Sequence, residues 1–161
     1  LTPTFAASTP MRLRADQLYS AITDVLGIDQ IGGRAQQARG ALRGGDRSPR
    51  GMFNELFGFD PSTPQDDLVG EVPQALFMMN SPILNNLNRA EGRTRLAQLL
   101  KEYPEDKDSV IELYLLVLSR EPSASELSIC EEFIKETGER GEAFEDIQWS
   151  LINSSEFLSK R

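Results

Sequence analysis

Residues 106–119 contain the densest apolar stretch of the chain, with eight apolar residues among the nine positions 110–118. A helix that is apolar on every side must be surrounded by other elements of the fold. The longest uninterrupted apolar run, residues 113–118, is far shorter than the roughly 20 residues that span a bilayer. We therefore predict a central helix that is buried nearly all round, and no transmembrane segment.

Helical spacing of apolar residues, interrupted by turn residues, predicts further helices around this one. They cover residues 11–28, a short helix that ends near residue 58, and residues 74–79, 82–89, 92–103, 123–138 and 142–158. Ser123 and Glu126 have the spacing of a capping box. No convincing strand is present. The sequence thus predicts an all-α fold, an irregular multi-helix bundle formed by a single domain, residues 1–161, with its C-terminal core in residues 106–158.

Two segments lack this pattern. Residues 1–10 are predicted to be an extended lead-in, and the chain begins at Leu1 without a leader, which is typical of a processed protein or an excised segment. Residues 32–51 interleave six glycines with five arginines and contain only four apolar residues. A segment of this composition buries little surface, so we predict a long, flexible Gly/Arg-rich loop.

The arginines of this loop are candidates for binding an anion. A guanidinium can grip phosphate, sulfate or carboxylate bidentately, which makes Arg43, Arg47 and Arg50 the candidate anion-binding residues and an anionic polysaccharide a candidate ligand. The alternative is a solvated arm over the acidic C-terminal helices, or a disordered connector. A nucleotide-binding loop is not indicated, because no Gly-Lys-Ser/Thr ending is present.

Composition excludes several kinds of chemistry. The chain has no histidine and one cysteine, so it cannot form a Ser-His-Asp site, a His-ligated zinc site, an internal disulfide or a Cys-x-x-Cys-His haem attachment. The net charge is −8, and residues 91–161 carry nine basic and 16 acidic side chains. Because an acidic domain is repelled by phosphate backbones, no nucleic-acid partner is expected. No catalytic residue, cofactor or metal is predicted for this chain.

Aspartate and cysteine residues are two further candidate sites. Asp106 and Asp108 fit the first and third positions of a calcium loop, but Val110 and Glu112 do not complete its ligand pattern. We therefore expect both aspartates in the first turn of the buried helix, where negative charge is favourable. Cys130 is expected to be a small buried hydrophobe.

Residues 57–86 read FGFDPSTPQDDLVGEVPQALFMMNSPILNN. They contain, in order, a Phe-Asp-Pro turn at 59–61, a Pro-Gln-Ala-Leu helix start at 73–76 and an Asn-Ser-Pro break at 80–82. This order resembles the signature region of domain of unknown function 1553, the C-terminal part of large exported planctomycete proteins. Residues 12–18 are similar to an Arg-Leu-x-Ala-Glu-x-Leu helix of the same family.

The C-terminal residues resemble the ending of that family. The matching positions are Leu113-Tyr114, residues 118–122 (Leu-Ser-Arg-Glu-Pro), Glu126 and residues 151–158 (Leu-Ile-Asn-Ser-Ser-Glu-Phe-Leu). The pattern is also similar to domain of unknown function 4214, a helical module of secreted bacterial proteins. In this pattern we expect the Arg-x-Pro turn to end one core helix, and the Glu-Phe pair to dock the last helix back onto it.

The resemblance implies a context more than a reaction. Proteins of the first family are exported and commonly contain a cytochrome-c-like domain, and no catalytic residues of the family can be transferred to this chain. We expect a non-catalytic helical structural or interaction domain of an exported multidomain bacterial protein, periplasmic or on the cell surface. Its partners would be other domains of the polypeptide or a separate protein. The alternatives are an accessory domain of a haem-associated oxidoreductase or polysaccharide-processing enzyme, and binding of anionic glycans through the Arg-rich loop.

Overall fold

The structure, a computed structural model, describes residues 11–13, 15–27 and 82–160. Within these ranges there are six helices: α1 (Ala15–Leu26), α5 (Pro82–Leu87), α6 (Arg95–Glu102), α7 (Asp106–Leu118), α8 (Ala124–Thr137) and α9 (Arg140–Ile152). Two strands of two residues each, β1 (Met11–Arg12) and β2 (Ser159–Lys160), form an antiparallel pair. Helices make up 70% of the described residues, which confirms the all-α class for this part of the chain. The predictions for residues 1–10, for the Gly/Arg-rich loop and for the helices between residues 51 and 79 lie outside the described residues.

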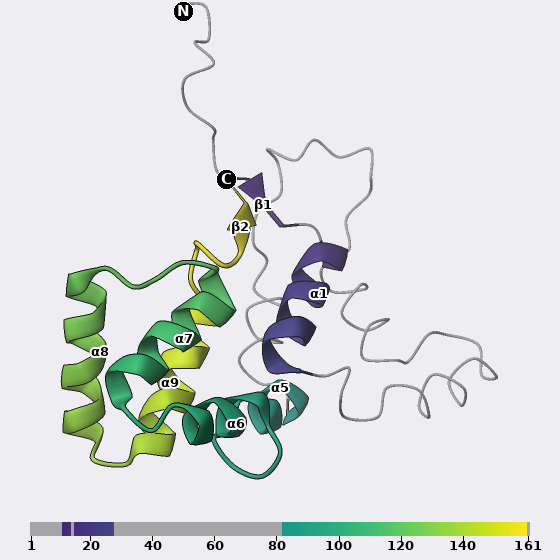
Figure 1. The fold of residues 1–161 in the computed structure, drawn as a ribbon. Helices are drawn as coiled ribbons and strands as arrows, with labels where there is room; N and C mark the ends of the chain where they lie inside the picture. The colour runs from purple at the N-terminus through teal and green to yellow at the C-terminus, as the bar shows by residue number, and fades with distance from the viewer. Residues whose placement is uncertain (1–10, 14, 28–81, 161) are drawn as a thin grey trace, which may run out of the picture.

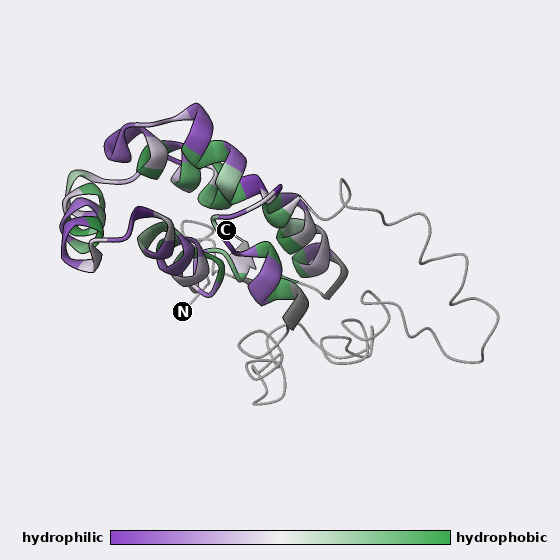
Figure 2. Ribbon diagram, turned by 90° about the horizontal axis from the view of Figure 1, so that it is seen from below, coloured by the Kyte–Doolittle hydropathy of each residue, from purple (hydrophilic) through white to green (hydrophobic). Residues whose placement is uncertain are grey.

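Helices α7, α8 and α9 pack against one another, α6 packs against α7 and α9, and α1 packs against α6 (Figure 1). The hydrophobic sides of these helices face inward (Figure 2). The side chains with the least exposure include Leu113 of α7, Phe144 and Ile152 of α9, and Leu18 and Ile22 of α1. None of the helices within the described ranges combines the length and apolar character that a bilayer crossing requires.

Helix α7 packs against α6, α8 and α9, as expected for a core helix. Val110, Leu113, Tyr114 and Val117 are buried, whereas Leu115 is 38% exposed. The buried side chains lie on one face of the helix, whereas Lys107 and Asp108 are exposed and Ile111, Glu112, Leu116 and Leu118 are half-buried. The prediction of a helix buried nearly all round is therefore wrong, because α8, α9 and α6 cover one face of α7 and leave the opposite face in contact with solvent. The first turn of α7 carries Asp106 and Asp108, as predicted.

The helix ends follow local sequence signals. Ser123 and Glu126 form the predicted capping box at the start of α8. Gly138, with φ +75°, ends α8 in the left-handed conformation that glycine adopts without strain. Ser119 ends α7 in the same region with φ 55°, although it carries a side chain. Thr94 caps α6, where its Oγ1 accepts from the Ala97 N–H at 3.1 Å.

The last helix is shorter than predicted. It spans Arg140–Ile152 and not residues 142–158. Asn153 Nδ2 donates to the Trp149 carbonyl at 2.8 Å, and Ser154 Oγ donates to the Leu151 carbonyl at 2.7 Å. Because these side chains bond the carbonyls of the final turn, they compete with continuation of the helix.

The first helix also begins later than predicted, at Ala15 and not at residue 11. Met11 and Arg12 pair with Lys160 and Ser159, and the Leu13 N–H donates to the Leu158 carbonyl at 2.9 Å. This pairing satisfies the backbone of residues 11–13 from a segment almost 150 positions away in the sequence, so no local pattern could indicate it.

Candidate functional site

Two of the ion pairs in the described residues meet at Arg120, which binds both Glu126 and Glu156. Its Nε and Nη2 donate to the two carboxylate oxygens of Glu156, at 2.7 and 2.8 Å. Its Nη2 and Nη1 donate to the two oxygens of Glu126, at 2.8 and 3.0 Å. Nη1 also donates to the Glu121 carbonyl at 3.0 Å. All five N–H groups of this guanidinium therefore have an acceptor within the protein.

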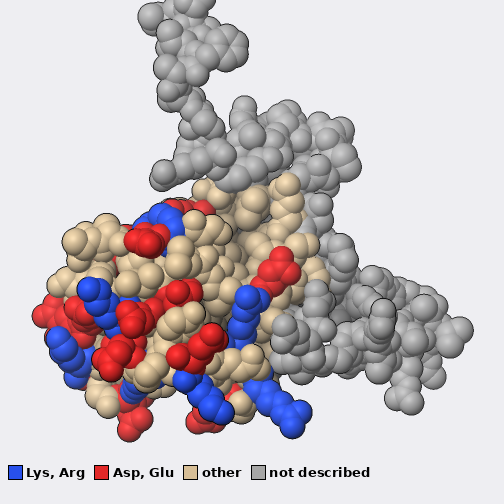
Figure 3. Space-filling view, in the orientation of Figure 1, with Lys and Arg blue, Asp and Glu red and all other residues tan. Residues whose placement is uncertain are grey.

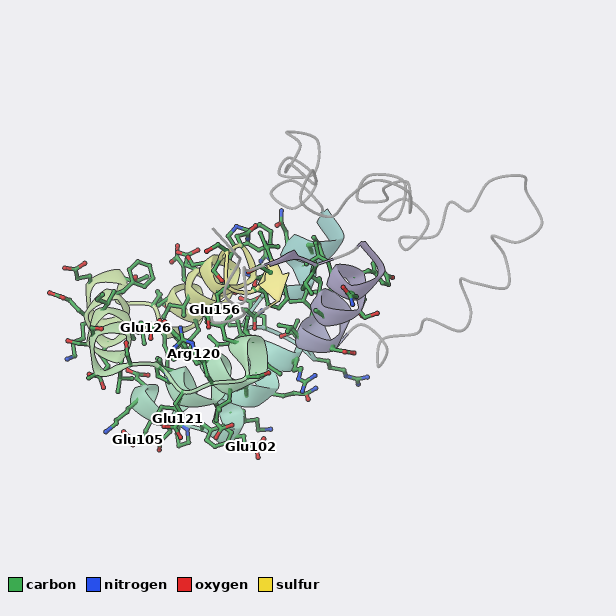
Figure 4. All side chains as sticks on the ribbon, turned by 90° about the horizontal axis from the view of Figure 1, so that it is seen from above. Glu102, Glu105, Arg120, Glu121, Glu126 and Glu156 are labelled. Atoms are coloured by element: carbon green, nitrogen blue, oxygen red, sulfur yellow. The ribbon has the colours of Figure 1, made fainter. Side chains whose placement is uncertain are left out.

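Three segments supply this network, which we call the Arg120 clamp (Arg120, Glu126 and Glu156). Arg120 follows the end of α7, Glu126 lies in the first turn of α8, and Glu156 follows α9. Figure 4 shows Arg120 between Glu126 and Glu156, with Glu102 and Glu105 apart from them. The Ser123 N–H and Oγ both donate to Glu126 Oε2 at 2.8 Å, so the capping box and the clamp share one carboxylate.

The clamp contacts the core through Tyr114. The Arg120 guanidinium lies 5.6 Å from the centroid of the Tyr114 ring, and the Tyr114 hydroxyl lies 3.9 Å from Cys130 Sγ. Burial raises the pKa of both Tyr114 and Cys130. Cys130 is 8% exposed, which confirms its predicted burial. Because its pKa is raised, the thiol stays protonated at neutral pH and is a poor nucleophile.

The electrostatics of the clamp favour the charged forms of Glu126 and Arg120. Hydrogen bonds from Arg120, and then from Ser123, lower the pKa of Glu126 from its ordinary 4.5 to about 2. Hydrogen bonds to Glu156 and Glu126 raise the pKa of Arg120 further above its ordinary range. A carboxyl with so low a pKa holds no proton at neutral pH, so Glu126 cannot serve as a general acid.

A second arginine, Arg140 at the start of α9, joins the ends of two other helices. Its Nε donates to Asp106 Oδ1 at 2.7 Å, and its Nη1 to the Leu100 carbonyl at 3.0 Å. Its Nη2 donates to the Tyr103 carbonyl and to Ser109 Oγ, both at 2.9 Å. These acceptors lie at the end of α6 and the start of α7, so Arg140 holds α9 against the turn between them.

A polar pair lies inside the core, where α9 meets the residues after α5. Gln148, 1% exposed, donates from Nε2 to Asn88 Oδ1 at 2.9 Å. Asn88 Nδ2 in turn donates to the Glu145 carbonyl at 2.9 Å, and the Ala90 N–H donates to Glu145 Oε1 at 2.7 Å. Gln148 Oε1 has no hydrogen-bond partner in the described part of the chain. These contacts fix α5 and its following turn against α9.

The acidic residues weighed for calcium are used differently. Asp106 is paired with Arg140, which occupies one oxygen of the carboxylate that would begin a calcium loop. No group of three or more His, Cys, Asp or Glu residues suited to a metal ion occurs in the ranges that the structure describes. On the face shown in Figure 3, acidic and basic side chains are interspersed over the helices and are not separated by sign.

The anion-binding residues predicted from sequence, Arg43, Arg47 and Arg50, lie outside the described residues. The residues that the structure does bring together were missed as a cluster. Their signal was present, because Arg120, Glu126 and Glu156 all stand in the pattern that resembles the ending of the two families. The structure gives these three positions a shared physical role, the clamp.

Comparison of the chain with protein-family models finds no match. Searches of curated proteins and of solved structures find no match either. The resemblance to the two domains of unknown function therefore stays a prediction that rests on the quoted residues.

Proposed function

We propose that this chain is an irregular multi-helix bundle that acts as a non-catalytic structural and interaction domain of an exported multidomain bacterial protein. Export and the multidomain context are supported by the resemblance of residues 57–86 and 111–158. The non-catalytic role is supported by how the described polar groups are used. The partner is another domain of the same polypeptide or a separate protein.

The observation that carries the proposal is the saturation of Arg120. Its five donors meet two carboxylates and one carbonyl from the helix ends around it. An arginine that binds a substrate must keep donors directed at a ligand, whereas this one is fully engaged in joining three segments. Arg140 is used in the same way, with four donated hydrogen bonds that join α6, α7 and α9.

A stability scan of the polar clusters tests the proposal. Active-site residues are commonly kept at a cost in stability, so replacing them can stabilise a protein, whereas replacing a structural residue destabilises it. We expect Arg120→Ala and Arg140→Ala each to lower the melting temperature of the purified chain. The matched control is Arg93→Ala, because Arg93 is exposed and, within the described residues, only its backbone carbonyl is bonded. A clearly raised melting temperature in either cluster variant, with helical content retained, would contradict the proposal.

A visible absorption spectrum tests the oxidoreductase alternative. The chain has no histidine, so its residues offer haem none of the usual imidazole ligation. We expect the purified chain, incubated with haem and passed through a desalting column, to show no Soret band at stoichiometric intensity. A stoichiometric band that survives this step would overturn the non-catalytic assignment in favour of the haem-associated alternative.

A further inference from the structure

The segment after α9 crosses from the end of the helical unit to the N-terminal strand. We call residues 155–160 the C-terminal strap. At its start, the Phe157 N–H donates to Ser154 Oγ at 3.2 Å and the Leu158 N–H donates to the Ser154 carbonyl at 3.1 Å. These local bonds give the strap a turn of its own, separate from the α9 ladder.

Asn153 and Ser154 remain bonded to the last turn of α9. Beyond them, residues 155–160 are held to the rest of the described residues in three ways. Glu156 is bound bidentately by Arg120, at 2.7 and 2.8 Å. The Phe157 side chain is buried, at 7% exposure. Beyond it, Leu158 accepts a hydrogen bond from the Leu13 N–H at 2.9 Å, and β2 pairs with β1. The first is polar and lies at the surface. The third combines backbone hydrogen bonds with the Leu13 and Leu158 side chains, which are partly buried against the core.

Each polar attachment is weak when it stands alone. A two-stranded sheet is marginal in water, and this one has only two residues per strand. The side chains of Arg120 and Glu156 are each 36% exposed, so water and salt screen their attraction. The helices below have independent support, because Leu113, Phe144 and Ile147 are buried among α6 to α9 and Arg140 ties three of those helices together.

We propose that the C-terminal strap is a releasable unit, which detaches while α6 to α9 stay folded, and that Arg120 is its lock. Proteins open locally in contiguous units whose stability is lower than that of the core, and few attachments mark such a unit. Detachment of residues 155–160 separates β2 from β1, so the N-terminal strand is released together with the strap. It also uncovers the Phe157 side chain and leaves Arg120 bound only to Glu126 and to the Glu121 carbonyl. The binding of Glu156 by Arg120 therefore stabilises the attachment of both β2 and β1, which lie at the two ends of the described fold.

Native-state amide hydrogen exchange on the full chain tests this proposal. The amides of Leu13 and Leu158 report on the strap, and those of Val117 and Leu151 report on α7 and α9. We expect the strap amides to exchange faster than the helix amides, by openings that small amounts of urea do not accelerate. In Glu156→Gln the strap amides should exchange about fivefold faster, the ratio that corresponds to roughly 1 kcal/mol for a half-exposed bidentate pair. Global unfolding also breaks this pair, so the helix amides should accelerate by no more than the same ratio, and the gap between the strap and helix rates should remain.

Glu121→Gln is the matched control, because it removes one carboxylate at the same corner while only the backbone carbonyl of Glu121 binds Arg120. It should leave both sets of amides unchanged. Arg120→Lys provides a second lock variant, with circular dichroism to verify that the helices remain. The proposal is overturned if the strap and helix amides exchange at one common rate, or if Glu156→Gln and Arg120→Lys both leave the Leu13 and Leu158 amides unchanged.

Discussion

At the scale of single residues, Arg120 shows why a charged side chain at a helix end can be structural. The planar fork of its guanidinium matches two carboxylates at once, each through two hydrogen bonds. The ring of Tyr114 covers one side of the charge. A lysine in this place would supply one point charge and three donors, and it could not reproduce two bidentate pairs.

We predict that Arg120→Lys and Arg120→Ala both lower the free energy of unfolding, by about 1–2 kcal/mol for two half-exposed bidentate pairs. Urea denaturation followed by circular dichroism measures the change. Glu121→Gln, which leaves both pairs intact, should stay within about 0.5 kcal/mol of the wild type. A lysine variant as stable as the wild type would show that the bidentate geometry contributes nothing.

A second residue-scale prediction concerns pH. Because the pKa of Glu126 is lowered from 4.5 to about 2 on folding, its carboxylate stabilises the folded state fully above pH 4.5. That contribution is lost as the pH falls from 4.5 towards 2, since the unfolded state then binds the proton more readily. In Glu126→Gln the contribution is absent at every pH. The difference in unfolding free energy between wild type and variant should therefore be largest at neutral pH and shrink below pH 4.5. Urea titrations at pH 7, 4 and 2.5 would reveal a constant difference if the assignment is wrong.

At the scale of elements, the sequence predicts the helix ends that local signals determine. It does not predict the ends that depend on other contacts. Ser123, Glu126 and Gly138 act on neighbours within four positions, so their spacing alone predicts both ends of α8. The end of α9 was misplaced, because apolar Phe157 and Leu158 extend the helical pattern while the side chains of residues 153–154 bond the last carbonyls. The start of α1 was misplaced for another reason, since the pairing of β1 depends on a distant strand.

Ser119 offers a test of helix-end strain. It holds φ at 55°, a conformation that costs an L-residue roughly 1–2 kcal/mol. Ser119→Gly removes this strain but adds unfolded-state freedom, so we expect a net gain of up to about 1 kcal/mol in unfolding free energy. Thermal unfolding by calorimetry measures it.

The reverse substitution, Gly138→Ala, is the matched comparison. A Cβ at Gly138 would meet no atom of the described residues within 4 Å, so its cost of about 1 kcal/mol would be conformational. If both substitutions shift the melting temperature in the same direction, the strain at Ser119 is relieved by contacts that glycine would remove.

At the scale of the whole molecule, one apolar core joins α1 to the four helices from α6 to α9. Its class and the packing of α7 against other helices follow from the apolar pattern. The partners of Arg120 could not be predicted from the apolar pattern of the sequence. Glu156 lies 36 positions from it, and which of 25 acidic residues meets a given arginine is decided by how the helices pack.

The different burial of two apolar residues predicts that their truncation to alanine will lower the unfolding free energy by very different amounts. Phe144 is fully buried, so Phe144→Ala should cost about 3–5 kcal/mol, much of the total stability of a domain of this size. Leu115 is 38% exposed, and Leu115→Ala should cost less than about 1 kcal/mol. Urea midpoints compare the two. A loss at Leu115 as large as that at Phe144 would mean that the exposed face of α7 is covered in solution.

The pairing of Met11 with Lys160 also determines how the fold would respond to mechanical force. Tension that pulls residues 11 and 160 apart acts first on the antiparallel β1–β2 pair, which lies directly between the two points. In this geometry the hydrogen bonds of the pair break one after another. The α6 to α9 helices bear no load until the pair and the Leu13–Leu158 bond have opened. Between two tethered neighbours, the fold would thus behave as a soft link that lengthens at its ends before its core is stretched.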